Sequence, residues 1–78
     1  MPEALTKMEA VTLEQTIALM REKAYPPTAR EVAVAMGVST SLVAQRFTAM
    51  RQKGYITREF NRGRAFRVLF GSDGSPLT

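Results

Sequence analysis

Cysteine and histidine are both absent from this sequence of 78 residues. Their absence excludes thiol nucleophiles, disulfides, imidazole general bases and the usual ligands of structural zinc. An enzyme would have to use carboxylates, serines or lysines, and Glu22, Glu31 and Glu59 are instead typical of surface or capping positions. We therefore expect no enzyme, and we predict no catalytic residue, no metal site and no cofactor.

Long apolar runs are also missing. The longest has five residues, Val32 to Met36, whereas a helix that crosses a bilayer needs about 20 and the core of a signal peptide at least about 7. The sequence therefore predicts a soluble chain in the cytoplasm, without a membrane partner. Its length suits one small domain, because two hydrophobic cores could not be filled from 78 residues.

Acidic residues are scarce in the second half of the chain. Residues 44–70 contain seven Lys and Arg residues and a single acidic residue, Glu59, which gives this segment a net charge of +6, whereas residues 1–43 have a net charge of −1. A basic segment of this density favours a polyanion as partner, nucleic acid before an anionic membrane surface. The alternative for the charge alone is an Arg-rich face that only keeps the protein soluble.

An N-terminal capping box predicts the start of the first helix. Thr12 and Gln15 have the spacing of such a box. Pro26 and Pro27 end the helix, because proline disfavours helical geometry in the residue before it and lacks an N–H donor. Helical spacing gives this helix one apolar stripe, formed by Leu13, Ile17, Met20 and Ala24. Residues 1–11 are then an N-terminal arm, in which residues 2–11 could form a further helical turn or two, and which either packs on a partner chain or frays.

Two further helices are bracketed in the same way. Thr28 and Glu31 form a second box, and Gly37 supplies the left-handed residue that closes a helix of about two turns. The apolar positions of this helix are Val32, Ala35 and Met36. Ser39 caps a third helix, which continues to residue 53 and ends at Gly54.

The pattern changes to that of a β-hairpin after the third helix. Residues 55–60 and 65–70 are rich in aromatic and β-branched side chains, and a basic tip at residues 61–64 separates them. The strand residues expected in the core are Ile56, Phe60, Phe66 and Val68. Their register stays open, because a bulge would invert it. Residues 71–78 are expected to form a flexible tail, so the domain proper spans residues 12–70 and is mainly α with a small β-hairpin (α+β).

The helices on either side of Gly37, Val38 and Ser39, followed by the hairpin, have the order of a helix-turn-helix with a wing. Ala33 is a small residue that lets the two helices approach closely, the turn glycine adopts a positive φ, and Val38 packs the turn against the core. Over residues 13–69 the chain resembles a winged helix-turn-helix DNA-binding domain of the bacterial repressor type. The resemblance implies a three-helix core and a two-stranded wing.

Two stretches carry this resemblance. Residues 26–33, PPTAREVA, are similar to the entry into the second helix of the N-terminal domain of LexA repressors, and residues 37–56 resemble the recognition helix and first wing strand of MarR-like regulators. The resemblance implies sequence-specific binding to double-stranded DNA. Self-cleaving LexA repressors carry a second, protease domain to which no part of this chain corresponds, so autoproteolysis is not implied.

A helical wheel of residues 40–53 separates a buried face from an outward one. Val43, Phe47 and Met50 fall on one side and are expected in the core. The residues near the opposite pole are Ser41, Gln45, Thr48 and Gln52. Hydroxyls and amides of this kind contact base edges in the major groove, where glutamine pairs best with adenine. The alternative is a solvated helix face without a partner.

Other polar residues are suited to the DNA backbone. Ser39 and Thr40 begin the third helix and Thr28 begins the second. The free amides and the dipole of a helix N-terminus attract a phosphate there, in addition to the capping role of these side chains. Arg46 lies between the buried and outward faces, so it reaches either a phosphate or the apolar surface that its stem can cover.

Arg62 and Arg64 flank Gly63 at the predicted hairpin tip. A wing reaches an adjacent minor groove or its phosphates from this position. The alternative is a solvated turn, and we favour the DNA contact because Arg58 and Arg67 extend the same positive band.

These features predict a sequence-specific DNA-binding protein, a small transcriptional regulator and most simply a repressor, with residues 40–53 in the major groove and residues 61–64 on the backbone or in the minor groove. The alternative is a protein-interaction module or an adaptor in a larger nucleoprotein assembly, although the outward stripe lacks the large apolar anchors of such a face. Regulators of this type usually bind two half-sites as symmetric dimers. The arm around Leu5 and Met8 is the best candidate for a homodimer contact.

Overall fold

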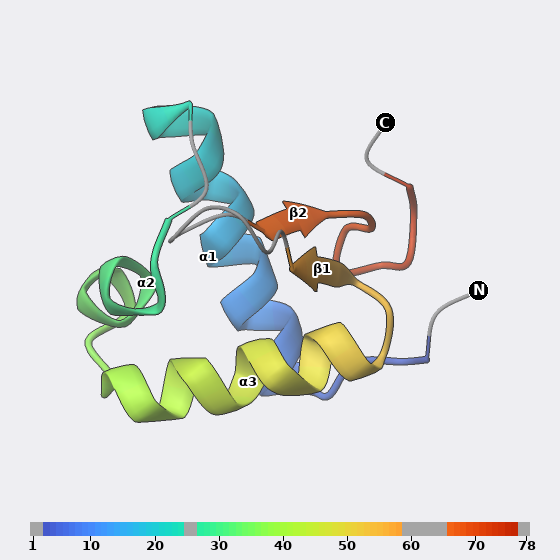
Figure 1. Cartoon of the computed structure of the whole chain (residues 1–78), viewed down its shortest axis with the longest axis horizontal. Coiled ribbons are helices and arrows are strands. Elements are labelled where there is room, and N and C mark those ends of the chain that lie inside the picture. The colour runs from blue at the N-terminus through green and yellow to red at the C-terminus, as the bar shows by residue number, and fades with distance from the viewer. Residues whose placement is uncertain (1–2, 25–26, 59–65, 77–78) are drawn as a thin grey trace.

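Three helices and two short strands follow one another along the chain in the computed structural model, which describes residues 3–24, 27–58 and 66–76. The elements are α1 (Lys7–Lys23), α2 (Ala29–Met36), α3 (Thr40–Gln52), β1 (Ile56–Arg58) and β2 (Phe66–Val68). Helix α3 runs along one edge of the molecule and crosses the direction of α1 (Figure 1). The predicted mainly helical class with three helices is confirmed. Within the described ranges, no helix has the length and apolar character needed to cross a membrane.

The first helix begins earlier than predicted. Thr6 is its N-cap, with a capping box in which the Thr6 hydroxyl accepts from Glu9 N at 3.2 Å and Glu9 Oε1 accepts from Thr6 N at 3.0 Å. Thr12, predicted as the cap, lies inside α1 and is fully buried, and its Oγ1 donates to Met8 O at 2.8 Å. The predicted start at Thr12 is wrong, because a threonine inside a helix can bond to the carbonyl four residues before it instead of capping. Residues 7–11 therefore belong to α1.

The end of α1 also differs from the prediction by one residue. Ala24, predicted on the apolar stripe, is exposed and adopts the left-handed conformation with φ 61°. Its backbone N–H donates to Met20 O at 2.8 Å, which ends the helix before the proline pair. Ala24 therefore terminates the helix and does not contribute to the core.

The predicted caps of α2 and the predicted N-cap of α3 are confirmed, whereas α3 ends one residue earlier than predicted, at Gln52, with Lys53 as its C-cap. The Thr28 hydroxyl accepts from Glu31 N at 3.1 Å, while Glu31 Oε1 accepts from Thr28 N at 2.8 Å. Gly37 ends α2 with φ 72°, a left-handed conformation that favours glycine. Ser39 Oγ accepts from Leu42 N at 3.2 Å and begins α3. The turn between the two helices is therefore bounded by Gly37, which ends α2, and by Ser39, which caps α3.

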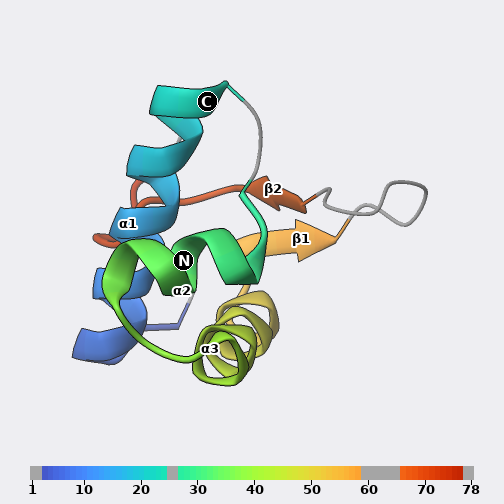
Figure 2. The same ribbon diagram turned by 90° about the vertical axis from the view of Figure 1, so that its left-hand side faces the viewer.

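The two strands pair antiparallel, with Ile56 opposite Val68, Thr57 opposite Arg67 and Arg58 opposite Phe66. They are shorter than predicted, and they lie side by side next to the helices in Figure 2. Residues 59–65, which include the predicted basic tip, lie outside the described residues, as does the predicted core side chain of Phe66. The buried strand positions that the structure does describe are Ile56 and Val68.

Two apolar clusters form the core, and α3 contributes to both. The first contains Leu13, Met50, Tyr55, Ile56 and Val68, and the second contains Val32, Ala33 and Val43. Phe47 packs against both clusters, and Val38 packs against the second, as predicted for the turn. Ala35, predicted on the apolar side of α2, is exposed, because the buried side of this short helix is formed by Val32 and Ala33.

The segment after β2 folds back on α1. Gly71 N donates to Ser75 O at 2.8 Å, and Ser72 Oγ donates to Glu14 Oε2 on α1 at 2.7 Å. Phe70 forms an isolated bridge with Pro76. The sequence predicts a flexible tail here, whereas the described part, residues 71–76, is a hydrogen-bonded turn against the first helix.

Candidate nucleic-acid interface

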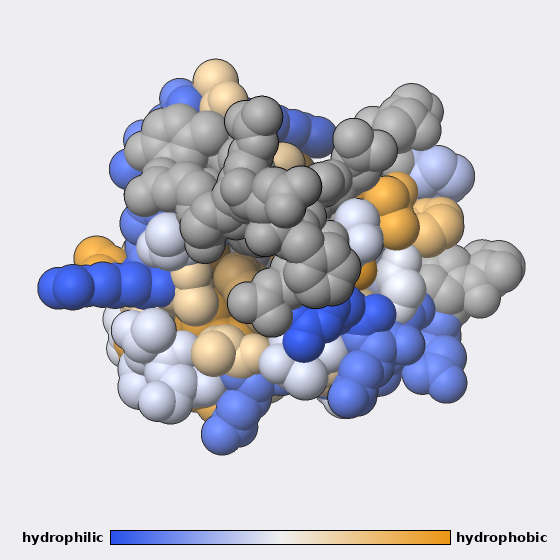
Figure 3. Space-filling model, viewed as in Figure 1, coloured by the Kyte–Doolittle hydropathy of each residue, from blue (hydrophilic) through white to orange (hydrophobic). Residues whose placement is uncertain are grey.

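The outward stripe predicted on α3 is exposed in the structure. Val43 and Met50 are completely buried on the inner side of this helix. The four predicted outward residues, Ser41, Gln45, Thr48 and Gln52, are all exposed. In the space-filling view, the lower edge of the molecule, where α3 lies, shows mainly white and blue surface (Figure 3). The geometry of the stripe is therefore as predicted, and its contact with DNA stays a prediction.

The exposed surface of α3 is wider than the predicted stripe. Ala44 and Arg51 are also exposed, together with Thr40 at the start of the helix. Ala44 and Arg51 are seven residues apart, so they lie on one side of the helix two turns from each other. We call the seven exposed residues, Thr40, Ser41, Ala44, Gln45, Thr48, Arg51 and Gln52, the exposed face of α3. The helical wheel does not indicate this position for Arg51, because Arg51 follows Phe47 by four residues and so lies only about 40° from a predicted core position.

The capping hydroxyls keep hydrogen-bonding capacity for a partner. Ser39 Oγ and Thr28 Oγ1 each accept one backbone N–H of their own helix, and each hydroxyl can still donate its own proton. Ser39 is exposed, whereas Thr28 is half-buried. Thr48 Oγ1 donates to Ala44 O at 3.1 Å, which leaves its oxygen able to accept. Phosphate contacts of Ser39, Thr40 and Thr28 stay predictions.

Arg46 is turned toward the first helix. Its Nη1 donates to Thr12 Oγ1 at 3.1 Å, and the residue is half-buried. The sequence left two roles open for Arg46, a contact with a phosphate or a position in which its stem covers apolar surface. In the structure, part of its guanidinium is occupied by a residue of α1 that sequence spacing could not identify, because the two residues are 34 positions apart.

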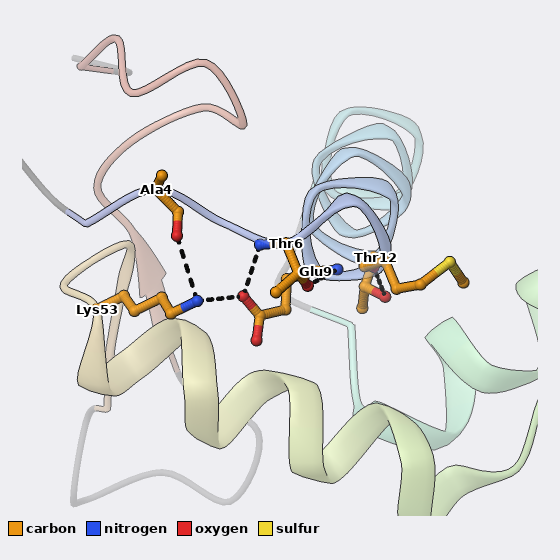
Figure 4. A network of polar contacts seen from close by, with 6 residues as sticks. Ala4, Thr6, Glu9, Thr12 and Lys53 are labelled. Atoms are coloured by element: carbon orange, nitrogen blue, oxygen red, sulfur yellow. Dashed lines mark hydrogen bonds and ion pairs between the residues drawn. The ribbon is translucent and has the colours of Figure 1, made fainter.

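Lys53, the C-cap of α3, is also bound to α1 (Figure 4). Its Nζ donates to Glu9 Oε1 at 2.7 Å and to Ala4 O at 3.2 Å. The hydrogen bond from Lys53, followed by the backbone N–H of Thr6, holds the pKa of the Glu9 carboxyl below its ordinary value. One of the seven cations of the basic segment is therefore neutralised within the molecule.

Acid is expected to remove the stabilising contribution of the pair formed by Glu9 and Lys53. The pKa of Glu9 in the folded protein lies below its ordinary value of 4.5. The contribution is therefore complete above the unfolded-state pKa and is lost as the pH falls through the folded-state pKa. Urea unfolding of the wild type and of Glu9→Gln, from about pH 7 down to about pH 2.5, should show a stability difference that disappears in acid.

Glu22→Gln is the control for the loss of one carboxylate, because Glu22 is an exposed residue near the end of α1. The stability of Glu22→Gln shows how much of the difference between the wild type and Glu9→Gln comes from the change in net charge alone. A difference between the wild type and Glu9→Gln that persists undiminished to the lowest pH would contradict the assigned ion pair.

The predicted wing contacts fall outside the part of the chain that the structure describes. Arg62 and Arg64 belong to residues 59–65, and the side chains of Arg58 and Arg67 are likewise not described. Their contact with DNA stays a prediction. The described strands establish only that the hairpin begins and ends next to the core, at Ile56 and Val68.

Comparison with known proteins gives one consistent result. Residues 2–65 match the family described as the LexA DNA binding domain. The chain is 41% identical over 66 residues to the LexA repressor of Frankia casuarinae, which covers 83% of this chain and 26% of that protein. It is 41% identical over 66 residues to the LexA repressor of Mycobacteroides abscessus, which covers 83% of this chain and 30% of that protein.

A longer alignment is found with the LexA repressor of Mycobacterium tuberculosis. The identity is 39% over 75 residues, which covers 95% of this chain and 31% of that protein. The chain thus spans less than a third of the length of these curated relatives.

Proposed function

The chain belongs to the LexA DNA-binding domain family, and from this premise we propose that it binds double-stranded operator DNA as the DNA-binding part of a transcriptional repressor. Helix α3 enters the major groove with its exposed face toward the bases. The observation that carries this proposal is the chemistry of that face, which consists of the hydroxyl side chains of Ser and Thr, the amides of two glutamines, the methyl group of Ala44 and the guanidinium of Arg51. It contains no carboxylate that would oppose the phosphates.

The hairpin serves as the wing in this proposal. Arg62 and Arg64 lie in the connection between β1 and β2, so they reach the phosphates or the minor groove beside the site of α3. Ser39, Thr40 and Thr28 contact phosphates from the N-terminal ends of α3 and α2. Such contacts fix the position of the domain, while the exposed face of α3 supplies the sequence preference.

An adaptor role is less well supported. A protein-binding face usually contains large aromatic or apolar anchors, and the exposed face of α3 has none. A large apolar residue with high exposure is found instead on α2, where Val34 is 75% exposed. A single residue of this kind is ordinary on protein surfaces.

Two substitutions should separate base contacts from phosphate contacts. Gln45→Ala is expected to weaken binding to a selected duplex by about tenfold or more, with a smaller loss on random duplex, because it removes one base contact. Arg62→Ala is expected to weaken binding to both duplexes alike and to reduce the slope of log affinity against log salt by about 1. Fluorescence anisotropy over a salt series measures both quantities, after selection of bound sites from random duplexes.

Equal losses for the two variants on both duplexes would contradict the separate roles of helix and wing. A wild-type protein whose affinity barely changes with salt would contradict a DNA-binding surface altogether, because each phosphate contact contributes about −0.9 to the slope.

Two copies of the chain bind two half-sites in this proposal, as is usual for helix-turn-helix regulators. Leu5, expected on a dimer contact, packs against the core of its own chain, whereas Met8 is 48% exposed and Val11 is 40% exposed on the outer side of α1. The first helix is therefore the better candidate for the contact. Sedimentation with duplexes that carry one or two half-sites would establish the stoichiometry.

A further inference from the structure

Two polar contacts tie α3 to the beginning of α1. On α3, Arg46 and Lys53 are seven residues apart and therefore lie on the same side of the helix, two turns from each other. On α1, their partners Thr12 and Glu9 are three residues apart and occupy one side of adjacent turns. The two contacts join residues 34 and 44 positions apart in the chain.

Both partners on α1 are themselves held by the backbone. Glu9 Oε1, which accepts from Lys53, also accepts from the backbone N–H of Thr6. Thr12 Oγ1, which accepts from Arg46, donates to Met8 O. Neither partner can turn to another position without losing a hydrogen bond of its own helix. In the ion pair, the side chain of Lys53 is 22% exposed and that of Glu9 is 13% exposed. Solvent therefore weakens this ion pair less than an ordinary pair on the surface.

Because the two polar contacts lie at separate points along α3, they restrict rotation of the helix about its own axis. The apolar contacts of Val43 and Met50 bury surface but are non-directional, whereas hydrogen bonds have a narrow range of length and angle. Side-chain atoms lie about 5 Å from the axis of a helix, so a rotation of about 20° would move them by nearly 2 Å. A displacement of this size exceeds the tolerance of a base contact.

We propose that Glu9 and Thr12 are positioning residues for DNA recognition, which hold Lys53 and Arg46 so that α3 keeps the rotation at which its exposed face meets the base edges. This inference rests on the proposed function. It assigns Lys53 to the placement of the helix and removes it from the cations that contact phosphate. The basic segment therefore serves two purposes, although its charges are alike in the sequence.

The test compares Lys53→Met with Arg51→Met. Each variant removes one positive charge from the C-terminal part of α3 and keeps a long side chain, but Arg51 is exposed whereas Lys53 is paired with Glu9. Lys53→Met is expected to weaken binding to the selected duplex by about tenfold, with little loss on random duplex and an unchanged salt slope. Arg51→Met removes an exposed guanidinium and is expected to reduce the salt slope by about 1.

Two more variants distinguish positioning from stability. Thr12→Val removes the acceptor of Arg46 with little change in volume and should shift the ratio of selected to random affinity in the same direction as Lys53→Met. Lys53→Arg keeps the charge and should retain most of that ratio. All affinities are measured well below the melting temperature of each variant, with the active fraction determined by stoichiometric titration.

Each outcome is decisive. A lower salt slope for Lys53→Met, with equal losses on both duplexes, would show that Lys53 contacts phosphate and would overturn the inference. A lower melting temperature with an unchanged affinity ratio would show that the pair only stabilises the fold, which also overturns it. A wild-type chain that selects no duplex contradicts the proposed function, and the positioning role with it, before any variant is measured.

Discussion

Replacing Gln45 by glutamate is expected to weaken binding to the selected duplex about 100-fold, because it places a carboxylate on the exposed face of α3. The substitution preserves the shape of the side chain and changes only its charge and its hydrogen-bonding character. Juxtaposed like charges at an interface cost several kcal/mol, and a 100-fold loss corresponds to about 2.7 kcal/mol. Fluorescence anisotropy at about 0.1 M salt measures the loss directly.

Gln15→Glu is the matched control, since it makes the same chemical change on α1 and alters the net charge by the same amount. Gln15 is half-buried on α1 and does not belong to the exposed face of α3, so its replacement should change the affinity of the folded protein by no more than about twofold. Equal losses for the two variants would mean that net charge alone governs binding.

A repeated selection with Gln45→Glu provides an independent check. Glutamate accepts a hydrogen bond from the amino group of cytosine, whereas glutamine pairs best with adenine. The preferred base opposite residue 45 should therefore change from adenine to cytosine. An unchanged selection would remove Gln45 from the residues that contact bases.

Leu13→Ala is expected to lower the free energy of unfolding by about 2–5 kcal/mol, the range for deletion of a fully buried leucine side chain. Leu13 is completely buried in the cluster with Met50, Tyr55, Ile56 and Val68. For a domain of this length the total is on the order of 4–12 kcal/mol, so the substitution should remove a large part of the stability and lower the urea midpoint clearly. Urea unfolding followed by circular dichroism measures the change.

Val34→Ala is the control for Leu13→Ala, because it also shortens an aliphatic side chain within a helix. Val34 is 75% exposed, so its truncation should change stability by no more than about 0.5 kcal/mol. Comparable losses for Val34→Ala and Leu13→Ala would contradict the assignment of the core.

Caps were predictable from the sequence where a single capping box was available. Thr28 and Glu31 stand directly after two prolines, so no competing start exists nearby, and the structure confirms this box. Ahead of the first helix, by contrast, Thr6 with Glu9 and Thr12 with Gln15 have the same spacing. Local pattern cannot choose between them, and the choice is made by burial of Thr12 against the rest of the fold.

The exposed stripe of α3 was predictable because one periodicity determines both sides of a helix. Once Val43 and Met50 are in the core, Ser41 and Gln45 must face outward. The roles of the cations were not predictable in this way. Charge counting treats Lys53 and Arg51 alike, and only the packing of α1 beside α3 shows that Lys53 is paired within the molecule.

Phe47 belongs to the packing of both apolar clusters, so α3 cannot leave one cluster without disturbing the other. Amide protons of α2 and of the strand segment should therefore exchange with solvent through a common opening event. A ligand that binds only the closed form lowers the population of the open one. DNA bound at α3 should thus slow hydrogen exchange in segments that it never touches.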